Sequence, residues 1–269
     1  MKHFELEARP LQCSIGQTCE ERQPNITGDT IFYEAGIPVG FYIRDIGEYS
    51  EKAAYLADIA DRELRSNRVP KTEMSRGPQG NKKQKLERAK AGKELVTQFS
   101  VILGGIAPKP HMRRDYPTVS SVHAVQTARN YIKAMRLLCA ESEAIIRQLM
   151  PEQYESQKKL IAENSPKQFR FGDLFTSSIA NFNVAAAYHQ DNANLKGCSN
   201  VIITKRKDSI GGNTHVPEYD ITVDSADNSM LFYPAWKNIH GVTPIRATGA
   251  GGFRNSLVFY PLKGFRNFV

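Results

Sequence analysis

The C-terminal part of this 269-residue chain consists of short apolar segments separated by clusters of glycine and asparagine. The apolar segments are residues 201–204, 215–216, 221–223, 229–233 and 256–260, and the turn clusters are Gly211-Gly212-Asn213 and Gly249-Ala250-Gly251-Gly252. Many short strands joined by such turns are typical of double-sheeted β structures. We therefore predict that residues 171–269 form a double-stranded β-helix, also called a jelly roll.

The preceding part, residues 1–170, is predicted to be a largely helical extension packed on this jelly roll. Apolar residues recur at helical spacing over residues 51–65 and again, for longer, over residues 122–150. The expected cap of the first helix is Ser50, and the expected cap and end of the second are Ser121 and Pro151. Each stripe is expected to face the core.

Strands are also expected before the jelly roll. Residues 30–33 and 39–43 have the composition of a strand pair, and residues 95–103 that of a further strand ended by Gly104-Gly105. The predicted fold class is therefore α+β. The two segments, 1–170 and 171–269, are expected to form one compact unit.

Two histidines and one aspartate carry the clearest chemical signal. His189 and Asp191 are two residues apart, so on an extended strand both side chains point to the same side. His240 can supply a second imidazole. Two histidines and one carboxylate on one face of an octahedral ion are the ligands of non-haem Fe(II) oxygenases, which keep the other positions open for cosubstrate and oxygen. The alternative is a polar loop without a metal, because a histidine and an aspartate two residues apart are common by chance.

An arginine opens a predicted buried strand shortly after the second histidine. Arg254 can pair in a bidentate manner with a carboxylate, which suits the far end of 2-oxoglutarate. Ser256 lies two residues further along, on the same strand face, and offers a hydroxyl donor. The predicted cofactors are Fe(II) and 2-oxoglutarate, with O2 as cosubstrate.

Around these residues the sequence resembles a known enzyme family. The matching parts are His189-Gln190-Asp191 with Asn194, His240-Gly241-Val242-Thr243-Pro244, and the run from Arg254 through Tyr260. They are similar to the TET/JBP dioxygenases, which oxidise the 5-methyl group of pyrimidines in DNA. The resemblance covers about Phe171 to Leu262, and the short chain suggests the compact phage and bacterial branch. It implies an Fe(II)- and 2-oxoglutarate-dependent dioxygenase that hydroxylates 5-methylcytosine or thymine in DNA.

The resemblance also implies roles for residues near the metal ligands. Asn194 matches the family asparagine that hydrogen-bonds the target base, and Tyr260 matches the aromatic residue that stacks on it. Without the family pattern they would be a turn residue and a core residue. His215 is either a further 2-oxoglutarate contact or a solvent-facing strand histidine. Leu262 stands where the animal branch places a base-contacting histidine, so thymine and 5-methylcytosine both stay open.

The charge distribution favours a polyanionic partner. The formal net charge is +8, and basic residues are concentrated between Arg62 and Lys93. Phosphate binding by this basic segment is the functional interpretation, and a solvated helix face is the alternative. A DNA substrate would present its target base flipped out of the duplex or in a single strand. The alternative function is an Fe(II)/2-oxoglutarate oxygenase acting on a protein side chain or a small molecule, which needs no basic segment.

The remaining composition indicates a cytoplasmic protein. The N-terminus lacks the apolar stretch of a signal peptide, and no apolar run is long enough to span a bilayer. The four cysteines are scattered, which fits a reducing compartment. We expect no membrane association, and location in the host cytoplasm if a phage encodes the chain.

Overall fold

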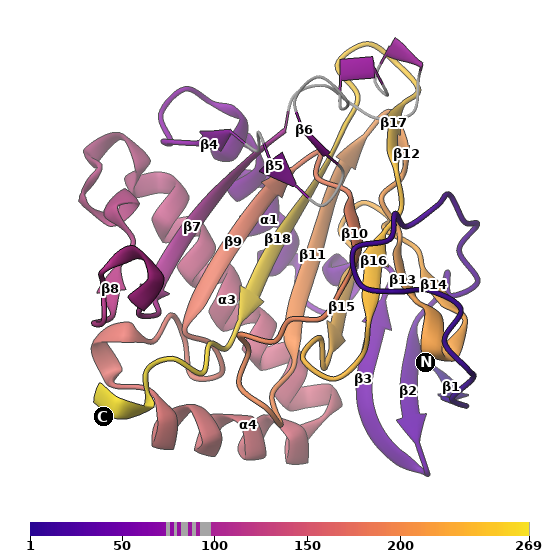
Figure 1. Cartoon of the computed structure of the whole chain (residues 1–269), viewed down its shortest axis with the longest axis horizontal. Coiled ribbons are helices and arrows are strands. Elements are labelled where there is room, and N and C mark those ends of the chain that lie inside the picture. The colour runs from indigo at the N-terminus through magenta and orange to yellow at the C-terminus, as the bar shows by residue number, and fades with distance from the viewer. Residues whose placement is uncertain (74–75, 78–79, 82–85, 88–89, 92–97, 269) are drawn as a thin grey trace.

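The structure is a computed structural model that describes residues 1–73, 76–77, 80–81, 86–87, 90–91 and 98–268. Its described strands form a major and a minor sheet (Figure 1) and two short two-stranded pairs. The major sheet contains, in spatial order, β1 (Lys2–Glu5), β2 (Thr30–Glu34), β3 (Ile37–Ile43), β15 (Met230–Tyr233), β11 (Asn200–Lys207), β18 (Phe253–Tyr260), β9 (Ser177–Phe182), β7 (Phe99–Ile106) and β4 (Thr72–Glu73), and β8 (Thr118–Val119) pairs with β7.

The minor sheet lies beside the major one and completes the double-sheeted core. Its strands, in spatial order, are β10 (Ala186–His189), β16 (His240–Val242), β13 (Thr214–Val216) and β14 (Ile221–Val223). The short pairs are β12 (Ser209–Gly211) with β17 (Ile245–Ala247), and β5 (Arg76–Gly77) with β6 (Gly80–Asn81). The predicted jelly-roll core is confirmed. Strands from before and after residue 170 share the major sheet, because β3 pairs with β15 and β7 pairs with β9.

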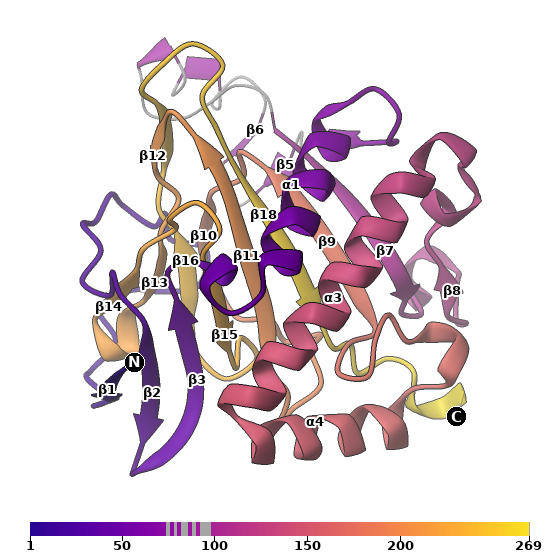
Figure 2. The same ribbon diagram turned by 180° about the vertical axis from the view of Figure 1, so that it is seen from behind.

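Helices cover the face of the major sheet that is turned away from the minor sheet (Figure 2). They are α1 (Glu51–Arg65), α3 (Arg129–Leu149) and, at the lower end of the sheet, α4 (Pro151–Asn164). Single 3-10 turns are η1 (Ile46–Glu48), η2 (Pro110–Met112), η3 (Ser121–Ala124), η4 (Gln126–Ala128), η5 (Lys167–Phe169), η6 (Pro217–Tyr219) and η7 (Arg266–Phe268). None of the helices in the described ranges has the length and apolar character needed to cross a bilayer.

The alternation of side chains along β18 separates the apolar core from the other face of the sheet. Leu257 and Phe259 are fully buried against the helices, in a cluster that includes Leu64 of α1 and Met135 of α3. Burying a large apolar side chain stabilises a fold by about 1.5–3 kcal/mol. Successive strand residues point to opposite faces, so the residues between them face a cavity instead.

The first helix has the predicted bounds, whereas the second has the predicted end but not the predicted start. Ser50 caps α1 by accepting the N–H of Ala53 at 3.1 Å. The second helix begins at Arg129 and not at residue 122, because η3 and η4 occupy the preceding residues. The expected cap is also wrong: Ser121 lies within η3, and Ala128, which makes no side-chain capping bond, precedes the first residue of α3. The predicted end is correct, because α3 ends at Leu149 just before Pro151. Pro151 also begins α4, in whose first turn its missing N–H is not needed.

The strands of the N-terminal part follow the prediction with one correction. The expected pair forms the antiparallel hairpin β2–β3. The expected strand 95–103 is β7, which continues through Gly104-Gly105 to Ile106, while residues 95–97 lie outside the described ranges. Gly104 has a φ of +81°, and a Cβ there would lie 2.6 Å from the carbonyl oxygen of Thr176. The glycines therefore allow close approach of β9 and do not end the strand.

An N-terminal arm, residues 9–26, crosses the outer face of the minor sheet as the indigo segment in Figure 1. The N–H of Gly16 donates to the carbonyl of Tyr188 at 2.8 Å, and the N–H of Tyr188 donates to the carbonyl of Gln17 at 2.9 Å. Ile26 forms a parallel bridge with Val223. A Cβ on Gly241 would lie 2.7 Å from Cβ of Cys19, so the arm packs directly on β16.

Candidate metal centre

His189, Asp191 and His240 come together at one end of two adjacent strands of the minor sheet. His189 ends β10 and His240 begins β16, and the two are antiparallel cross-strand partners. Asp191 follows in the loop after β10, where its N–H donates to the carbonyl of Ala235 at 3.1 Å. One ligand atom from each of the three side chains lies within 4.8 Å of the others. The predicted ligand set is therefore close enough to hold one metal ion.

Backbone carbonyls orient both imidazole rings. Nδ1 of His189 lies 2.8 Å from the carbonyl oxygen of Ala187, and Nδ1 of His240 lies 3.1 Å from that of Asn238. Each Nδ1 can therefore donate its hydrogen to a carbonyl, which leaves Nε2 as the metal-binding atom. Burial lowers the pKa of His240 to about 4, and the neighbouring His189 contributes to this shift. His240 is thus neutral at pH 7, the form that binds metals.

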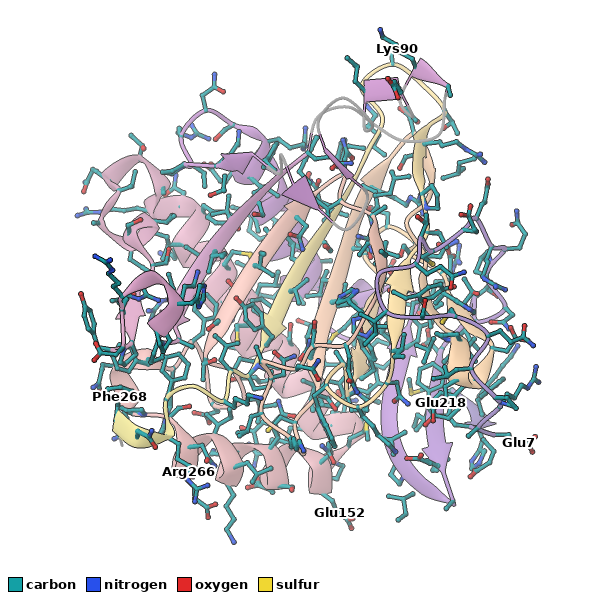
Figure 3. The ribbon with its side chains drawn as sticks, in the orientation of Figure 1. Glu7, Lys90, Glu152, Glu218, Arg266 and Phe268 are labelled. Carbon is teal, nitrogen blue, oxygen red and sulfur yellow. The ribbon has the colours of Figure 1, made fainter. Side chains whose placement is uncertain are left out.

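The three side chains open into a cavity of about 560 Å3 between the two sheets. Its apolar lining includes Ile179, Val184, Ile202 and Val258, and its polar lining includes Asn181, Asn194, Asn200, Arg254 and Ser256. A mixed lining of this kind, in a cavity of this size, is typical of small-molecule sites. Charged side chains at the periphery, such as Lys90, Glu152 and Arg266, instead project outward (Figure 3).

Arg254 is the one buried cation of the cavity lining in the described residues, and its guanidinium is only partly satisfied. It is 2% exposed, and Nη2 donates to Oγ of Ser225 at 3.2 Å. Its Nε is buried without a hydrogen-bond partner, and the described residues include no ion pair to it. Burial lowers the pKa of Arg254 to about 9, with a smaller contribution from Arg206. A carboxylate in the cavity would supply the missing acceptor and countercharge.

Neighbouring residues fix the backbone of Arg254 and leave space for its side chain. The N–H of Arg254 donates to Oδ1 of Asn183, a residue with a φ of 54° between β9 and β10. A Cβ on Gly212, which has a φ of +72°, would lie 3.1 Å from Nε of Arg254. Ser256 lines the same cavity, two residues further along β18, as the alternation predicts.

The family model Tet_JBP, the oxygenase domain of the 2OGFeDO superfamily, matches residues 113–263, which is more than half of the chain. The chain belongs to this family. The predicted resemblance to TET/JBP enzymes is confirmed, and the protein is an Fe(II)- and 2-oxoglutarate-dependent oxygenase. The donor set of this TET/JBP enzyme fits both cofactors, because two imidazoles and a carboxylate suit Fe(II) and the unfilled donor of Arg254 suits a carboxylate.

One solved structure supports the same fold. The TET/JBP chain is similar to NgTET1 in complex with 5mC DNA, with a TM-score of 0.54, 10% sequence identity, and coverage of 93% of this chain and 83% of that chain. OsALKBH1 gives a TM-score of 0.40 at 14% identity, with 81% and 96% coverage. An oxidoreductase of the 2OG-Fe(II) oxygenase family from Burkholderia pseudomallei gives 0.35 at 15% identity, with 78% and 92% coverage. No curated protein matches the chain.

Asn194 and Tyr260, which the TET/JBP resemblance predicts to contact the target nucleobase, also line the cavity. Asn194 is 4% exposed, and its Nδ2 donates to Oδ2 of Asp191 at 3.3 Å and to Oδ1 of Asn200 at 2.9 Å. Its amide nitrogen is therefore engaged, and its oxygen is the atom left for a ligand. Burial raises the pKa of Tyr260, and the nearby Asp191 adds to this shift. Leu262 lines the same cavity.

His215 lies away from the other predicted site residues of this TET/JBP enzyme. It pairs across the minor sheet with Gly241, one residue after His240, so the two imidazoles point to opposite faces. Nδ1 of His215 lies 2.9 Å from the carbonyl oxygen of Ile221, and the ring lines a separate cavity of about 180 Å3 beneath the N-terminal arm. This placement corrects the expectation of a 2-oxoglutarate contact. The residue is also 1% exposed, so it is not a solvent-facing histidine either.

Three residues at the site were not predicted. Asn200 donates a hydrogen bond to Asp191, and Ser225 accepts one from Arg254. The ring of Tyr233 packs edge-on against that of His240, with 5.4 Å between the ring centroids. None of them stands at a characteristic spacing from a metal ligand in the sequence. Only the strand pairing brings them to the TET/JBP site.

Proposed function

We propose that this TET/JBP oxygenase hydroxylates the 5-methyl group of a pyrimidine in DNA, either 5-methylcytosine or thymine. The observation that carries this proposal is that Asn194 and Tyr260 line the same cavity as the His189, Asp191 and His240 group. A base in that cavity would be within reach of both side chains and of the metal. The similarity in fold to NgTET1 in complex with 5mC DNA supports the proposal.

The cofactors would be held by both sheets. His189 and Asp191 at the end of β10 and His240 at the start of β16 would bind Fe(II), through two Nε2 atoms and one carboxylate oxygen. Arg254 would bind the far carboxylate of 2-oxoglutarate, with Ser256 as a hydroxyl donor. When bound, Fe(II) together with 2-oxoglutarate and O2 supplies the oxidant for the methyl group.

The substrate base would be positioned by the residues of the cavity. Oδ1 of Asn194 can accept a hydrogen bond from an N–H on the Watson–Crick edge, and both bases carry one. Tyr260 would stack on the base, and the apolar wall would exclude water from the reacting methyl group. A base in a duplex is buried in its stack, so the enzyme would act on a flipped or single-stranded nucleotide.

DNA binding has support from charge, although part of the predicted basic segment is engaged elsewhere. The net charge of +8 favours a polyanionic partner. Within the segment, Arg65 pairs with Asp61 at 2.9 Å and Arg68 pairs with Glu63 at 2.6 Å. Arg62 is exposed, whereas Lys82, Lys83 and Lys85 lie outside the described residues. Phosphate binding by the segment therefore stays a prediction that rests on its composition.

Mass spectrometry of nucleosides tests the proposal. DNA containing 5-methylcytosine, and separately DNA containing only thymine as its methylated base, is incubated with the enzyme, Fe(II), 2-oxoglutarate and air. We expect one of the two bases to gain an oxygen atom and the other to stay unchanged. The matched control is Arg254→Ala, which should reduce this product together with succinate.

The same experiment separates the alternative function. An oxygenase for a protein side chain or a small molecule would leave both DNA substrates unchanged. Turnover of 2-oxoglutarate with such a substrate, in the absence of DNA, would overturn the proposed substrate and keep the proposed cofactor site.

A further inference from the structure

Two asparagines donate hydrogen bonds to the same carboxylate oxygen of Asp191. Oδ2 of Asp191 accepts from Nδ2 of Asn200 at 2.9 Å and from Nδ2 of Asn194 at 3.3 Å. Oδ1 lies on the other side, 3.7 Å from Nε2 of His189. The two carboxylate oxygens therefore have different surroundings: Oδ2 receives two amide donors, and Oδ1 lies near the imidazole of His189.

The hydrogen-bond chemistry fixes the orientation of both amides. An ionised carboxylate only accepts, so each amide must turn its nitrogen toward Asp191. Oδ1 of Asn200 then faces Asn194 and accepts from its Nδ2 at 2.9 Å. Every contact of this triangle joins a donor to an acceptor, and flipping either amide would place two acceptors in contact. The arrangement is thus a single, fully consistent network.

Asn200 is the more firmly held of the two asparagines. It begins β11 in the middle of the major sheet and is the cross-strand partner of Tyr233, with 3% of its surface exposed. The preceding residue, Ser199, is held at both its N–H and its carbonyl by Gln157 of α4, at 2.7 and 3.0 Å. Asp191, by contrast, stands in a loop after β10. Asn200 thus connects a loop of the minor sheet to the rigid major sheet.

We propose that Asn200 is a positioning residue for the metal-binding carboxylate. It holds Oδ2 of Asp191 and thereby presents Oδ1 to the metal as a single ligand atom. Removing its amide leaves Oδ2 with only the longer contact from Asn194, so the carboxylate can turn and bind through both oxygens. Residues that hold metal ligands in this way change metal affinity by roughly 10- to 100-fold when they are replaced. The inference rests on the proposed metal site, and it does not depend on DNA as the substrate.

Binding of Co(II) to the full chain tests this role without any turnover. Asn200→Leu keeps the approximate size of the side chain and removes its donor and acceptor. We expect its dissociation constant for Co(II) to rise about 10- to 100-fold, and the visible absorption of the Co(II)-saturated protein to change because the carboxylate binds differently. Asn181→Leu is the matched control: it is an asparagine on β9 that lines the same cavity and bonds Ser256, not Asp191. Its Co(II) affinity and spectrum should equal those of the parent.

A folded Asn200→Leu protein with the parent's Co(II) affinity and spectrum would overturn the proposal. If circular dichroism shows that this variant does not fold, Asn200→Ala takes its place, because the smaller side chain cannot clash. The space left by the alanine variant can admit a water molecule that donates to Asp191 in place of the amide. We therefore expect its dissociation constant for Co(II) to lie between that of Asn181→Leu and that expected for Asn200→Leu. An affinity equal to that control would overturn the proposal as well.

The outcome is separable from that of the proposed function. If Co(II) binding depends on Asn200 while both DNA substrates stay unchanged, the positioning role holds and the proposed substrate fails. If the parent binds no Co(II), the metal site and the role of Asn200 fail together.

Discussion

The two faces of β18 differ in chemistry although they share one backbone. Toward the helices the strand presents Leu257 and Phe259, which are 0% exposed and surrounded by apolar side chains. Toward the minor sheet it presents Arg254 and Ser256, which line the cavity. We therefore expect fold stability and ligand binding to depend on alternate residues of this one strand. Substitutions at adjacent positions should affect different measurements, and the following predictions test that separation.

The largest effect is expected on the cavity side, at the carboxylate that faces it. Asp191→Ala should abolish 2-oxoglutarate turnover, because two neutral imidazoles bind Fe(II) weakly and leave its charge uncompensated. Succinate formation measures this. Succinate production at the parent's rate would remove Asp191 from the site.

On the helix side, Leu257→Ala should lower the free energy of unfolding by about 2–5 kcal/mol, because it leaves a cavity in the core. The KM for 2-oxoglutarate should not change in the protein that stays folded. Urea unfolding provides the first quantity and steady-state kinetics the second. The adjacent Ser256→Ala should show the reverse pattern, with a loss of about 0.5–1.5 kcal/mol at most and a higher KM. Equal destabilisation by both would contradict the division between the two faces.

Replacing the buried arginine of the cavity by lysine should have an intermediate effect on 2-oxoglutarate binding. Arg254→Lys should raise the KM for 2-oxoglutarate about 10- to 100-fold, since a point charge cannot reproduce a bidentate contact worth about 1.5–3 kcal/mol. Co(II) binding should be unaffected. Arg246→Lys is the control, because Arg246 lies on β17 in an ion pair with Glu21 and outside the cavity lining. If Arg246→Lys raised the KM and Arg254→Lys did not, the assignment would be wrong.

The smallest effect on catalysis is expected at His215, on the reverse face of the minor sheet. His215→Gln removes a ring that bonds Ile221 and Thr222 and should cost about 0.5–1.5 kcal/mol of stability. The KM for 2-oxoglutarate should stay within about twofold of the parent's, because the side chain does not line that cavity. A much larger increase in this KM would mean that His215 contacts 2-oxoglutarate, and it would contradict the strand pairing described above.

Features encoded by local spacing could be predicted from the sequence. The helix over residues 51–65 has the predicted bounds because a cap at Ser50 and a regular apolar stripe define it locally. His189 and Asp191 could be paired from their spacing, although Asp191 lies in the loop after β10 and not on the strand that the prediction assumed. The second helix was predicted to start too early because Val122 and Val125, in 3-10 turns, still pack on the core and extend the apolar stripe.

Features that depend on strand pairing could not be predicted. His215 lies on a short strand whose facing direction is set by its register against β16, and no local pattern encodes that register. Ser225 reaches Arg254 from a loop 29 residues earlier in the sequence. Asn200 is only nine residues after Asp191, but it contacts Asp191 from β11, a strand of the other sheet. Pro151 is ambiguous for a different reason, because a proline that cannot continue one helix is well suited to begin another.

The contact between Cys19 and Gly241 has a consequence for how small this oxygenase can be made. The arm packs on β16, the strand that carries His240. It contacts the face of this strand that is opposite to the cavity. A fragment trimmed to residues 113–263, the region of the family match, would lose this wall together with β2, β3 and α1. Tyr188 and Gly241 would then be exposed to water on the face that the arm now covers. His189 and His240, which are their neighbours in sequence, would be held less rigidly. We therefore expect the minimal folding unit of the metal centre to begin well before the segment that contains its ligands.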